Sequence, residues 1–499
     1  MRISLLFLLL VLGGAATAQP VRFSNATDIR HHNQWAIQVL ETDSEYVTLF
    51  VSDTILSLAM QAMVVGHFDK TGVVKHLKVF DDHLTAYSLG TGGSIFKSLL
   101  EKNYVIGGQL FSDTANGQFL IYAALIKLDE HFDTIWIRKF GLGQNDYNNF
   151  YYARQLSDGN YIAVGESNQL NGGAGNALKG YMVKTDTAGQ LIWEKSISLS
   201  DGDRALNVLV VYNGFMVSGG SFSTSTKLFP WIVKYDNDGN EQWRKRYGDS
   251  TIVSGILITP TNYSQNAFWA MGFIDSIGNQ NDFLNYNIYK IDTNGFVIKW
   301  VPYNSHWLSQ TSAIVNTDDG GFVGCGGMLT DSNIHGWVFK FDSNAHCQWS
   351  RSYAIYNNAL SYNTFQDIKI TSDGGLLLCG MASARGDENA WLVKLDRDGC
   401  LDENSCLNIQ PTFINEVPLS SNVNLYPNPA TTSIQLEFPP ETQLQQAQIS
   451  LFDLTGRLVL DLPVEQQQQT IALDLPPGLY FYSIKNHLVV CKQGKLVVK

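Results

Sequence analysis

The residues best placed to do chemistry in this sequence are the aspartates of a short Asp-x-x-Gly segment that recurs along the chain. The copy at residues 236–240 is the richest in side-chain oxygens, the ligand atoms that Ca²⁺ prefers. Calcium takes about six to eight oxygens, however, and an EF-hand-type loop needs a bidentate glutamate at its twelfth position. Arg246 and Tyr247 stand in that neighbourhood. We therefore interpret these segments as tight hairpin turns, and we expect neither a metal site nor a cofactor.

Motifs for a nucleophilic or zinc-dependent hydrolase are missing from the sequence. The ten histidines are scattered, and no Cys/His spacing fits a zinc site. Neither a Gly-x-Ser-x-Gly nucleophile elbow nor a His-Glu-x-x-His helix is present. Acidic pairs such as Asp318-Asp319 fall in turns that we place opposite the long loops. We nominate no catalytic residue.

Four of the six cysteines fall into two kinds of position, while Cys347 and Cys491 have no evident partner in the sequence. Cys400 and Cys406 flank a short acidic turn, and we expect a loop-closing disulfide between them, since an exported chain can keep disulfides. Cys325 and Cys379 hold matching positions in successive repeats. A thiol at such a position is typical of a small buried hydrophobic residue.

The Asp-x-x-Gly segments belong to a long internal repeat. Each aspartate follows an apolar strand that ends in a lysine and one further residue, as at residues 124–129. A second hairpin lies upstream, so each repeat holds four short strands. The repeat length of about 54 residues is close to that of a propeller blade. The seven aspartates are Asp69, Asp129, Asp186, Asp236, Asp292, Asp342 and Asp396.

These repeats predict an all-β fold, a seven-bladed β-propeller. The hydrophobic fraction of 44% allows a large core, and with 16% charged residues the composition excludes a disordered chain. A linear β-solenoid is the second possibility, but its coils are usually shorter. The seventh repeat lacks its fourth strand after Gly399, whereas Val21-Arg22-Phe23 precede the first repeat unassigned. We expect that segment to complete the seventh blade.

A different module follows the repeats. Residues 408–423 are mostly polar and are interpreted as a linker. From residue 424 the chain shows alternating strands, such as residues 434–438 and 449–453, over a length that suits a small Ig-like β-sandwich.

Four short motifs of this last module carry a family resemblance. They are Tyr-Pro-Asn-Pro-Ala at 426–430, Leu-Thr-Gly-Arg at 454–457, Pro-Gly-Leu-Tyr at 477–480 and the terminal Lys-Leu-Val-Val-Lys. In order and spacing they resemble the type A C-terminal sorting domain of the type IX secretion system. The resemblance implies a Bacteroidota protein read by the outer-membrane translocon, then cleaved by a sorting peptidase and released or joined to surface lipopolysaccharide. The sorting motif would include Pro427, Pro429, Gly478, Tyr480 and Lys495.

The N-terminus indicates an exported protein, and the net charge bears on its possible partners. Arg2, an apolar run at residues 3–12 and the small residues Ala16-Thr17-Ala18 form the pattern of a signal peptide, residues 1–18. The net charge of −12 repels phosphate backbones, so we expect no nucleic-acid partner. We expect a propeller at 19–407, a linker at 408–423, a sorting domain at 424–499, and a secreted or cell-surface protein.

Long loops gather on one face of the predicted propeller, because connections of strands two to three and four to one emerge together. They carry exposed aromatic residues among amides and acids, which suits contact with a glycan or a protein. We favour a non-catalytic binding module, and the alternative is a carbohydrate-active enzyme, a glycoside hydrolase or lyase, with its site on this face. The candidate ligand-binding residues are Tyr147, Asn148, Asp201, Trp307, Tyr356 and Asn358.

Overall fold

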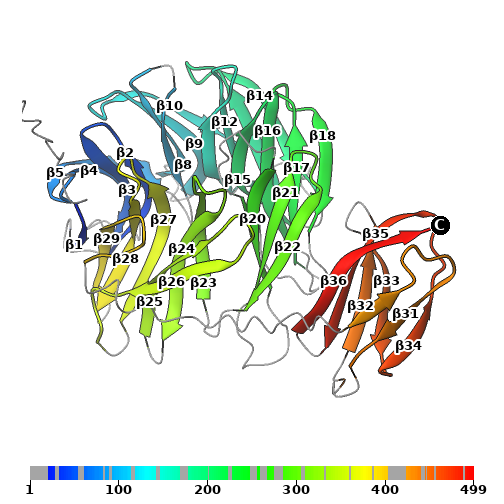
Figure 1. The fold of residues 1–499 in the computed structure, drawn as a ribbon. Coiled ribbons are helices and arrows are strands. Elements are labelled where there is room, and N and C mark those ends of the chain that lie inside the picture. Colours follow the sequence, from blue (N-terminus) through cyan, green and yellow to red (C-terminus); the bar gives the residue numbers. More distant parts are fainter. Residues whose placement is uncertain are drawn as a thin grey trace, which may run out of the picture.

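The computed structural model shows an all-β chain, and it describes the greater part of the repeats and of the C-terminal module (Figure 1). The described residues are 21–28, 33–53, 61–82, 85–88, 93–99, 101–113, 119–141, 147–168, 178–199, 202–222, 228–247, 256–258, 267–274, 285–304, 309–330, 333–358, 361–384, 387–402, 423–439, 444, 447–453, 457–486 and 489–499. The expected signal peptide and nearly all of the expected linker lie outside these ranges.

Strands β1 to β29 form seven four-stranded antiparallel blades arranged in a ring, with β6 joining the sheets of the first two blades. From the inner to the outer strand, the blades are: blade 1, β2 (Gln34–Glu41), β3 (Glu45–Asp53), β4 (Gln61–Asp69) and β5 (Val74–Asp82), followed by the joining strand β6 (Thr85–Ser88); blade 2, β7 (Ser94–Lys97), β8 (Tyr104–Asp113), β9 (Phe119–Leu128) and β10 (Thr134–Phe140); blade 3, β11 (Asn148–Gln155), β12 (Tyr161–Ser167), β13 (Lys179–Thr185) and β14 (Leu191–Ile197); blade 4, β15 (Asp203–Val211), β16 (Gly214–Phe222), β17 (Leu228–Tyr235) and β18 (Glu241–Arg246); blade 5, β19 (Ile256–Ile258), β20 (Ala267–Ile274), β21 (Asn285–Asp292) and β22 (Val297–Asn304); blade 6, β23 (Ser309–Asn316), β24 (Phe322–Thr330), β25 (Asn333–Phe341) and β26 (Cys347–Tyr353); blade 7, β27 (Tyr362–Ile370), β28 (Leu376–Ala384), β29 (Asp387–Leu395) and β1 (Phe23–Thr27).

The N-terminal strand closes the ring. Strand β1 pairs antiparallel with β29 from Phe23 opposite Lys394 to Thr27 opposite Ala390, so it is the outermost strand of blade 7. The expected closure is therefore confirmed, with one shift in bounds: the strand begins at Phe23, and Arg22 precedes it with its guanidinium 3.4 Å from the Asp396 carboxylate.

The recurring aspartate builds the same turn in every blade. The Asp236 carboxylate accepts the backbone N–H groups of Asp238 at 2.9 Å and Asn240 at 2.8 Å. The third residue after each aspartate has positive φ, usually at glycine, because a left-handed turn is costly for other residues. These bonds make each segment a tight hairpin turn, as the sequence predicts.

Packing between blades is a second reason why glycine occupies these turn positions. The tryptophan of one outer strand packs against the turn glycine of the next blade. A Cβ on Gly239 of blade 4 would lie 2.6 Å from the Trp193 ring of blade 3. Phe23 on β1 takes the tryptophan's place against Gly72 of blade 1, so the contact runs across the closure as well. The other pairs are Trp136 with Gly189, Trp243 with Gly295, and Trp349 with Gly399.

The two blades whose turns lack glycine support this reading. The turn of blade 2 has Phe132 and that of blade 6 has Ala345, both at positive φ, of 62° and 58°. The outer strands that precede them carry His76 and Lys299 at the tryptophan position. Where the outer strand of one blade lacks the tryptophan or phenylalanine, the turn of the next blade lacks the glycine.

We expect Gly239→Ala to destabilise the propeller by about 2 kcal/mol or more, because it adds the strain of a left-handed alanine to a collision with Trp193. Gly374 is the matched control, since its φ of +78° is similar but nothing lies within 4 Å of an added Cβ. Gly374→Ala should cost only about 1 kcal/mol of backbone strain. Thermal unfolding of both variants measures the difference, and equal losses would contradict a packing role for the tryptophan.

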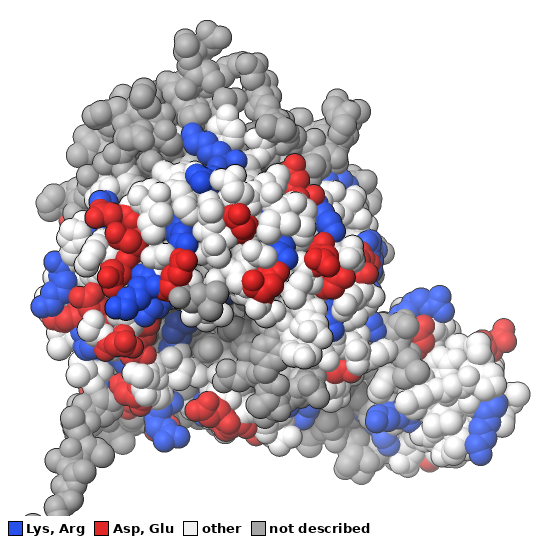
Figure 2. All heavy atoms as spheres, turned by 90° about the horizontal axis from the view of Figure 1, so that it is seen from above, with Lys and Arg blue, Asp and Glu red and all other residues white. Residues whose placement is uncertain are grey.

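The recurring lysine bridges neighbouring blades on the short-turn face. Lys184 in β13 donates to the Asp158 carboxylate in its own blade and to the Asn237 carbonyl in the next turn, both at 2.6 Å. Lys394 pairs with Asp373 at 3.0 Å although its side chain is fully buried. In both cases the lysine stem is buried and its head reaches a carboxylate. Basic and acidic side chains accordingly alternate on the face seen in Figure 2.

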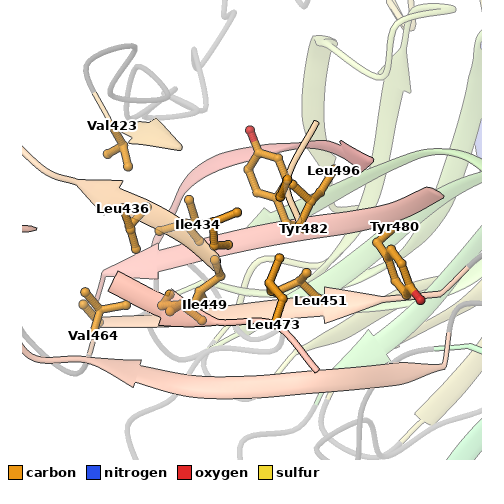
Figure 3. Packing of buried hydrophobic residues seen from close by; sticks show 14 of the residues in the cluster. Val423, Ile434, Leu436, Ile449, Leu451, Val464, Leu473, Tyr480, Tyr482 and Leu496 are labelled. Carbon is orange, nitrogen blue, oxygen red and sulfur yellow. The ribbon is translucent and has the colours of Figure 1, made fainter. Parts of the chain in front are cut away.

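The C-terminal module is a sandwich of two antiparallel sheets. One sheet has the order β30-β31-β34 and the other β33-β32-β35-β36. Between them lies one apolar core that includes Ile434, Ile449 and Leu496, each with at most 1% exposed surface (Figure 3). The strands are β30 (Asn424–Tyr426), β31 (Ser433–Glu437), β32 (Ala447–Phe452), β33 (Leu458–Val464), β34 (Gln468–Ala472), β35 (Gly478–Asn486) and β36 (Val489–Val498).

Candidate binding face

The long loops are held by polar residues at the start of the inner strands. Asn148, Asp203 and Asn363 occupy equivalent positions on the inner strands of blades 3, 4 and 7. Each lies two residues before the start of a β-bulge in its strand. At most 1% of each residue is exposed. A buried amide or carboxylate must bond to protein groups, and here those groups belong to the loops and the adjoining strands. The inner strands therefore fix the loops on this face.

Asn148 shows the arrangement in blade 3. Its Nδ2 donates to the Ile121 carbonyl at 3.0 Å, and its Oδ1 accepts from Ser167 Oγ at 2.6 Å. An amide enclosed in this way positions its neighbours, and the expectation that Asn148 contacts a ligand stays a prediction. Sequence reasoning could not separate the two roles, because an asparagine at a loop end suits both.

Tyr147 is the aromatic residue that this arrangement presents. Its backbone N–H donates to Asn168 Oδ1 at 2.8 Å, which ties the two ends of the blade's long connections together. The side chain is half-buried. Burial, with the nearby Glu166 carboxylate as the second cause, raises the pKa of the Tyr147 hydroxyl, so the group stays protonated and can donate a hydrogen bond.

Tyr356 is held in an equivalent way between blades 6 and 7. Asn363 accepts from the Tyr356 N–H at 3.2 Å and donates to its carbonyl at 3.0 Å. The half-buried phenol accepts from Asn389 Nδ2 at 3.2 Å. Asn358, in the same loop, is exposed, and its carbonyl accepts from Ser361. The remaining candidates, Trp307 and Asp201, lie outside the described residues.

A charged cluster that sequence reasoning missed lies beside Tyr147. The Glu166 carboxylate, 1% exposed, accepts from the Tyr151 hydroxyl at 2.5 Å and lies 2.7 Å from Arg204 Nε. The charge of Glu166 is thus balanced by an arginine of the next blade, as a buried carboxylate requires. The only sequence signal was an acid after Gly165 in β12, at a position that is uncharged in the other blades whose inner strands bulge, as at Gly220 and Gly327.

The two cysteines at matching repeat positions are buried, as expected. Cys325 in β24 and Cys379 in β28 are free thiols with no exposed surface, and burial raises the pKa of both well above its usual range. Cys400 is disulfide-bonded, while its expected partner Cys406 lies outside the described residues. Across the part of the chain that the structure describes, no three His, Cys, Asp or Glu side chains are grouped to hold a metal ion.

The motif residues of the C-terminal module converge on its last strand. Asn428, between Pro427 and Pro429, donates to the Lys495 carbonyl at 2.6 Å and accepts from the Val497 N–H at 3.0 Å. Tyr480 donates to the Pro476 carbonyl at 2.7 Å. Gly478 opens β35 opposite Val498, so the late motif pairs with the chain's end. Motifs about 70 residues apart thus form one unit.

Residues 424–499 match the family model of the secretion system C-terminal sorting domain. This module is a type IX sorting domain. A type IX sorting domain directs export, so the protein is secreted or displayed on the cell surface. No helix among the described residues is long and apolar enough to cross a membrane.

Comparison of the whole chain with known proteins adds little. No curated protein sequence matches it. Among solved structures, polysaccharide lyase Uly1 has a TM-score of 0.45 at 10% identity, covering 78% of this chain and 94% of the other. The Penicillium chrysogenum α-L-arabinanase has a TM-score of 0.41 at 9% identity, covering 61% and 93%. BBS1N, solved in complex with ARL6DN, also scores 0.41, at 10% identity, covering 77% and 100%. At these scores the likenesses say nothing about activity.

Proposed function

We propose that this protein is a secreted or surface-displayed binding module whose propeller holds a glycan or a protein on its long-loop face, without catalysis. In this proposal residues 1–18 are a signal peptide, 19–407 the propeller, 408–423 a linker and 424–499 the sorting domain. The family resemblance further suggests a Bacteroidota source, processing by the sorting peptidase, and release or attachment to surface lipopolysaccharide.

The observation that carries the proposal is the anchoring of the loop aromatics by buried polar residues. Tyr147 directly precedes Asn148, whose buried amide is hydrogen-bonded to the neighbouring strand. Tyr356 is held at both its backbone N–H and its carbonyl by Asn363. Aromatic side chains whose backbone is fixed before binding give contact area at a small entropy cost. A rigid frame that presents half-buried tyrosines among amides is the arrangement expected of a recognition surface.

A carbohydrate-active enzyme is the second candidate, and Glu166 is the observation in its favour. This buried carboxylate lies beside the same loops. Glycosidases usually need two carboxyl groups, about 5 to 9.5 Å apart. Within the described ranges Glu166 instead accepts from Tyr151 and is neutralised by Arg204, which favours binding over hydrolysis.

We expect Tyr147→Ala and Tyr356→Ala each to weaken binding of the best ligand on a glycan array by at least about 1 kcal/mol, a loss of about fivefold or more, if these rings are anchors. Tyr212→Ala is the matched control, because that tyrosine is 79% exposed in the β15–β16 hairpin on the short-turn face. Titration calorimetry of the array hit measures the affinities, and thermal unfolding checks the fold.

Unchanged affinity in both loop variants would refute the binding site. Release of shorter sugars from the array hit by the unaltered protein, abolished by Glu166→Gln, would favour the enzyme instead.

A further inference from the structure

One outer face of the sorting domain carries apolar side chains that its core does not use. In β32, Ile449 and Leu451 lie in the core with no exposed surface, so Phe452 points to the outer face (Figure 3). In β35, Tyr480 lies in the core, so Phe481 points outward in the same way. Phe452 and Phe481 lie opposite each other on the two paired strands, and both are half-buried.

The neighbouring strands extend these two rings into a strip. Leu458 in β33 lies opposite Phe452 and is 43% exposed. Val497 in β36 lies opposite Leu479 and is 37% exposed. An outward sheet face is normally polar, so an apolar strip across four strands indicates a surface that a partner covers. We call Phe452, Leu458, Leu479, Phe481 and Val497 the outer strip.

The outer face of the other sheet shows the contrast. Gln435 and Glu437 in β31 lie opposite Thr470 and Gln468 in β34, and their side chains alternate with the core residue Ile434 and its neighbours. The two faces belong to one small sandwich, and only one of them has the normal polar character. The outer strip is therefore not a requirement of the fold.

The free edge of the last strand is closed to a partner strand. The Asn428 amide bonds to the Lys495 carbonyl and the Val497 N–H, at 2.6 and 3.0 Å. The Ala430 N–H donates to the Val497 carbonyl at 2.7 Å, and the Ala430 carbonyl accepts from the Lys499 N–H at 2.9 Å. Strand addition needs unpaired backbone groups, so these bonds oppose recognition by sheet extension at this end and favour recognition through the face.

The part of the domain that borders the strip is cationic. Residues 475–499 contain four lysines and no acidic residue, in a protein with a net charge of −12. Lys495 lies opposite Phe481, is exposed, and forms no ion pair with another described residue. A surface of this kind is complementary to an apolar patch with acidic residues at its border.

We propose that the outer strip, with Lys495 at its border, is the surface through which the type IX export machinery binds this domain, and that the contacting surface of the machinery is apolar with an acidic border. A sorting domain is handled by that machinery, which makes one of its proteins the occupant of the strip. The inference rests on the sorting role of residues 424–499 and is independent of the ligand proposed for the propeller.

A negative charge in the outer strip should block export, whereas the same charge on the other face should not. Leu458→Glu should lower the displayed fraction of the full chain about tenfold or more, because it forces a carboxylate into an apolar contact with an acidic border. Thr470→Glu is the matched control, since Thr470 is exposed on the outer face of the other sheet. Protease treatment of intact cells measures display, and thermal unfolding of the purified full chain checks the fold.

Lys495 provides a second pair of variants that leaves the apolar residues in place. Lys495→Glu should reduce display, and Lys495→Arg should retain it because the charge is kept. The side chain is exposed, so neither change should alter the melting temperature.

Competition separates binding from the later steps of export. An excess of the unaltered full chain should slow the export of a reporter that carries residues 421–499, because both occupy the same machinery. An excess of the Leu458→Glu chain should slow it less, and the Thr470→Glu chain should slow it as much as the unaltered one.

Normal display of both Leu458→Glu and Lys495→Glu would overturn the outer strip as the docking surface. If deletion of residues 421–499 still abolished display, the sorting role would stand and the machinery would bind elsewhere on the domain. An equal loss of display in Thr470→Glu, at an unchanged melting temperature, would overturn the assignment to this face.

Discussion

Deleting residues 421–499 should abolish surface display of the propeller and leave the protein in the periplasm. The expected signal peptide carries a chain only across the inner membrane, whereas the sorting domain at 424–499 is the part that directs export beyond it. The domain has its own core between two sheets, so removing it opens no other core in the described chain. Protease treatment of intact cells, followed by cell fractionation, measures the location, and we expect nearly complete loss of the exposed form.

Two companion variants test this assignment further. Attaching residues 421–499 to a periplasmic reporter should bring that reporter to the cell exterior, which tests whether the domain is sufficient. Asn428→Ala removes two hydrogen bonds to the last strand and should reduce display in part, whereas Gln448→Ala, on the opposite sheet, should not. Display of the truncated propeller at the normal level would refute the role of the sorting domain.

Local spacing in the sequence was enough to predict the architecture. The repeated aspartates fixed the blade length, because each one ends a strand and caps the following turn with its own carboxylate. Closure by the N-terminal segment followed from a missing fourth strand in the last repeat and a spare segment ahead of the first. Such patterns are readable because each blade forms mainly from neighbouring residues.

The glycine and tryptophan positions were visible in the sequence, but their physical link was not. In the structure each of these tryptophans packs on the glycine of the following blade. A contact between repeats can be recognised in the sequence only where both partners are replaced together. Here Phe132 replaces the glycine where His76 replaces the tryptophan, and Ala345 replaces the glycine where Lys299 replaces the tryptophan.

The candidate sites were harder to predict for the same reason. Glu166 and Arg204 come from different blades, and Asp367 of blade 7 accepts the Val39 N–H of blade 1. No fixed spacing in the sequence joins residues that only the closed ring brings together. A lone asparagine such as Asn148 likewise gives no sign of whether its amide faces a ligand or its own loop.

The closure contact should account for a large part of the propeller's stability. We expect deletion of residues 19–27 to lower the free energy of unfolding by on the order of 5 kcal/mol, comparable to the whole stability of a small domain. Strand β1 supplies five paired positions to β29, and Phe23 packs on Gly72 and lies 6.1 Å from the Tyr46 ring. Its loss would also leave the indole N–H of Trp391, a residue 1% exposed, without its Ser24 acceptor at 3.0 Å.

The deletion also has a second consequence, because it bares the edge of β29. An unpaired, apolar edge strand is a template for pairing between chains, so we expect the truncated protein to aggregate on heating. A synthetic peptide of residues 19–30 added in trans should restore the melting temperature by strand addition, and the same peptide with Phe23→Ala should do so less well. If the truncated protein melts at the original temperature, or if the peptide has no effect, then β1 does not hold the ring closed and the seventh blade is stable with three strands.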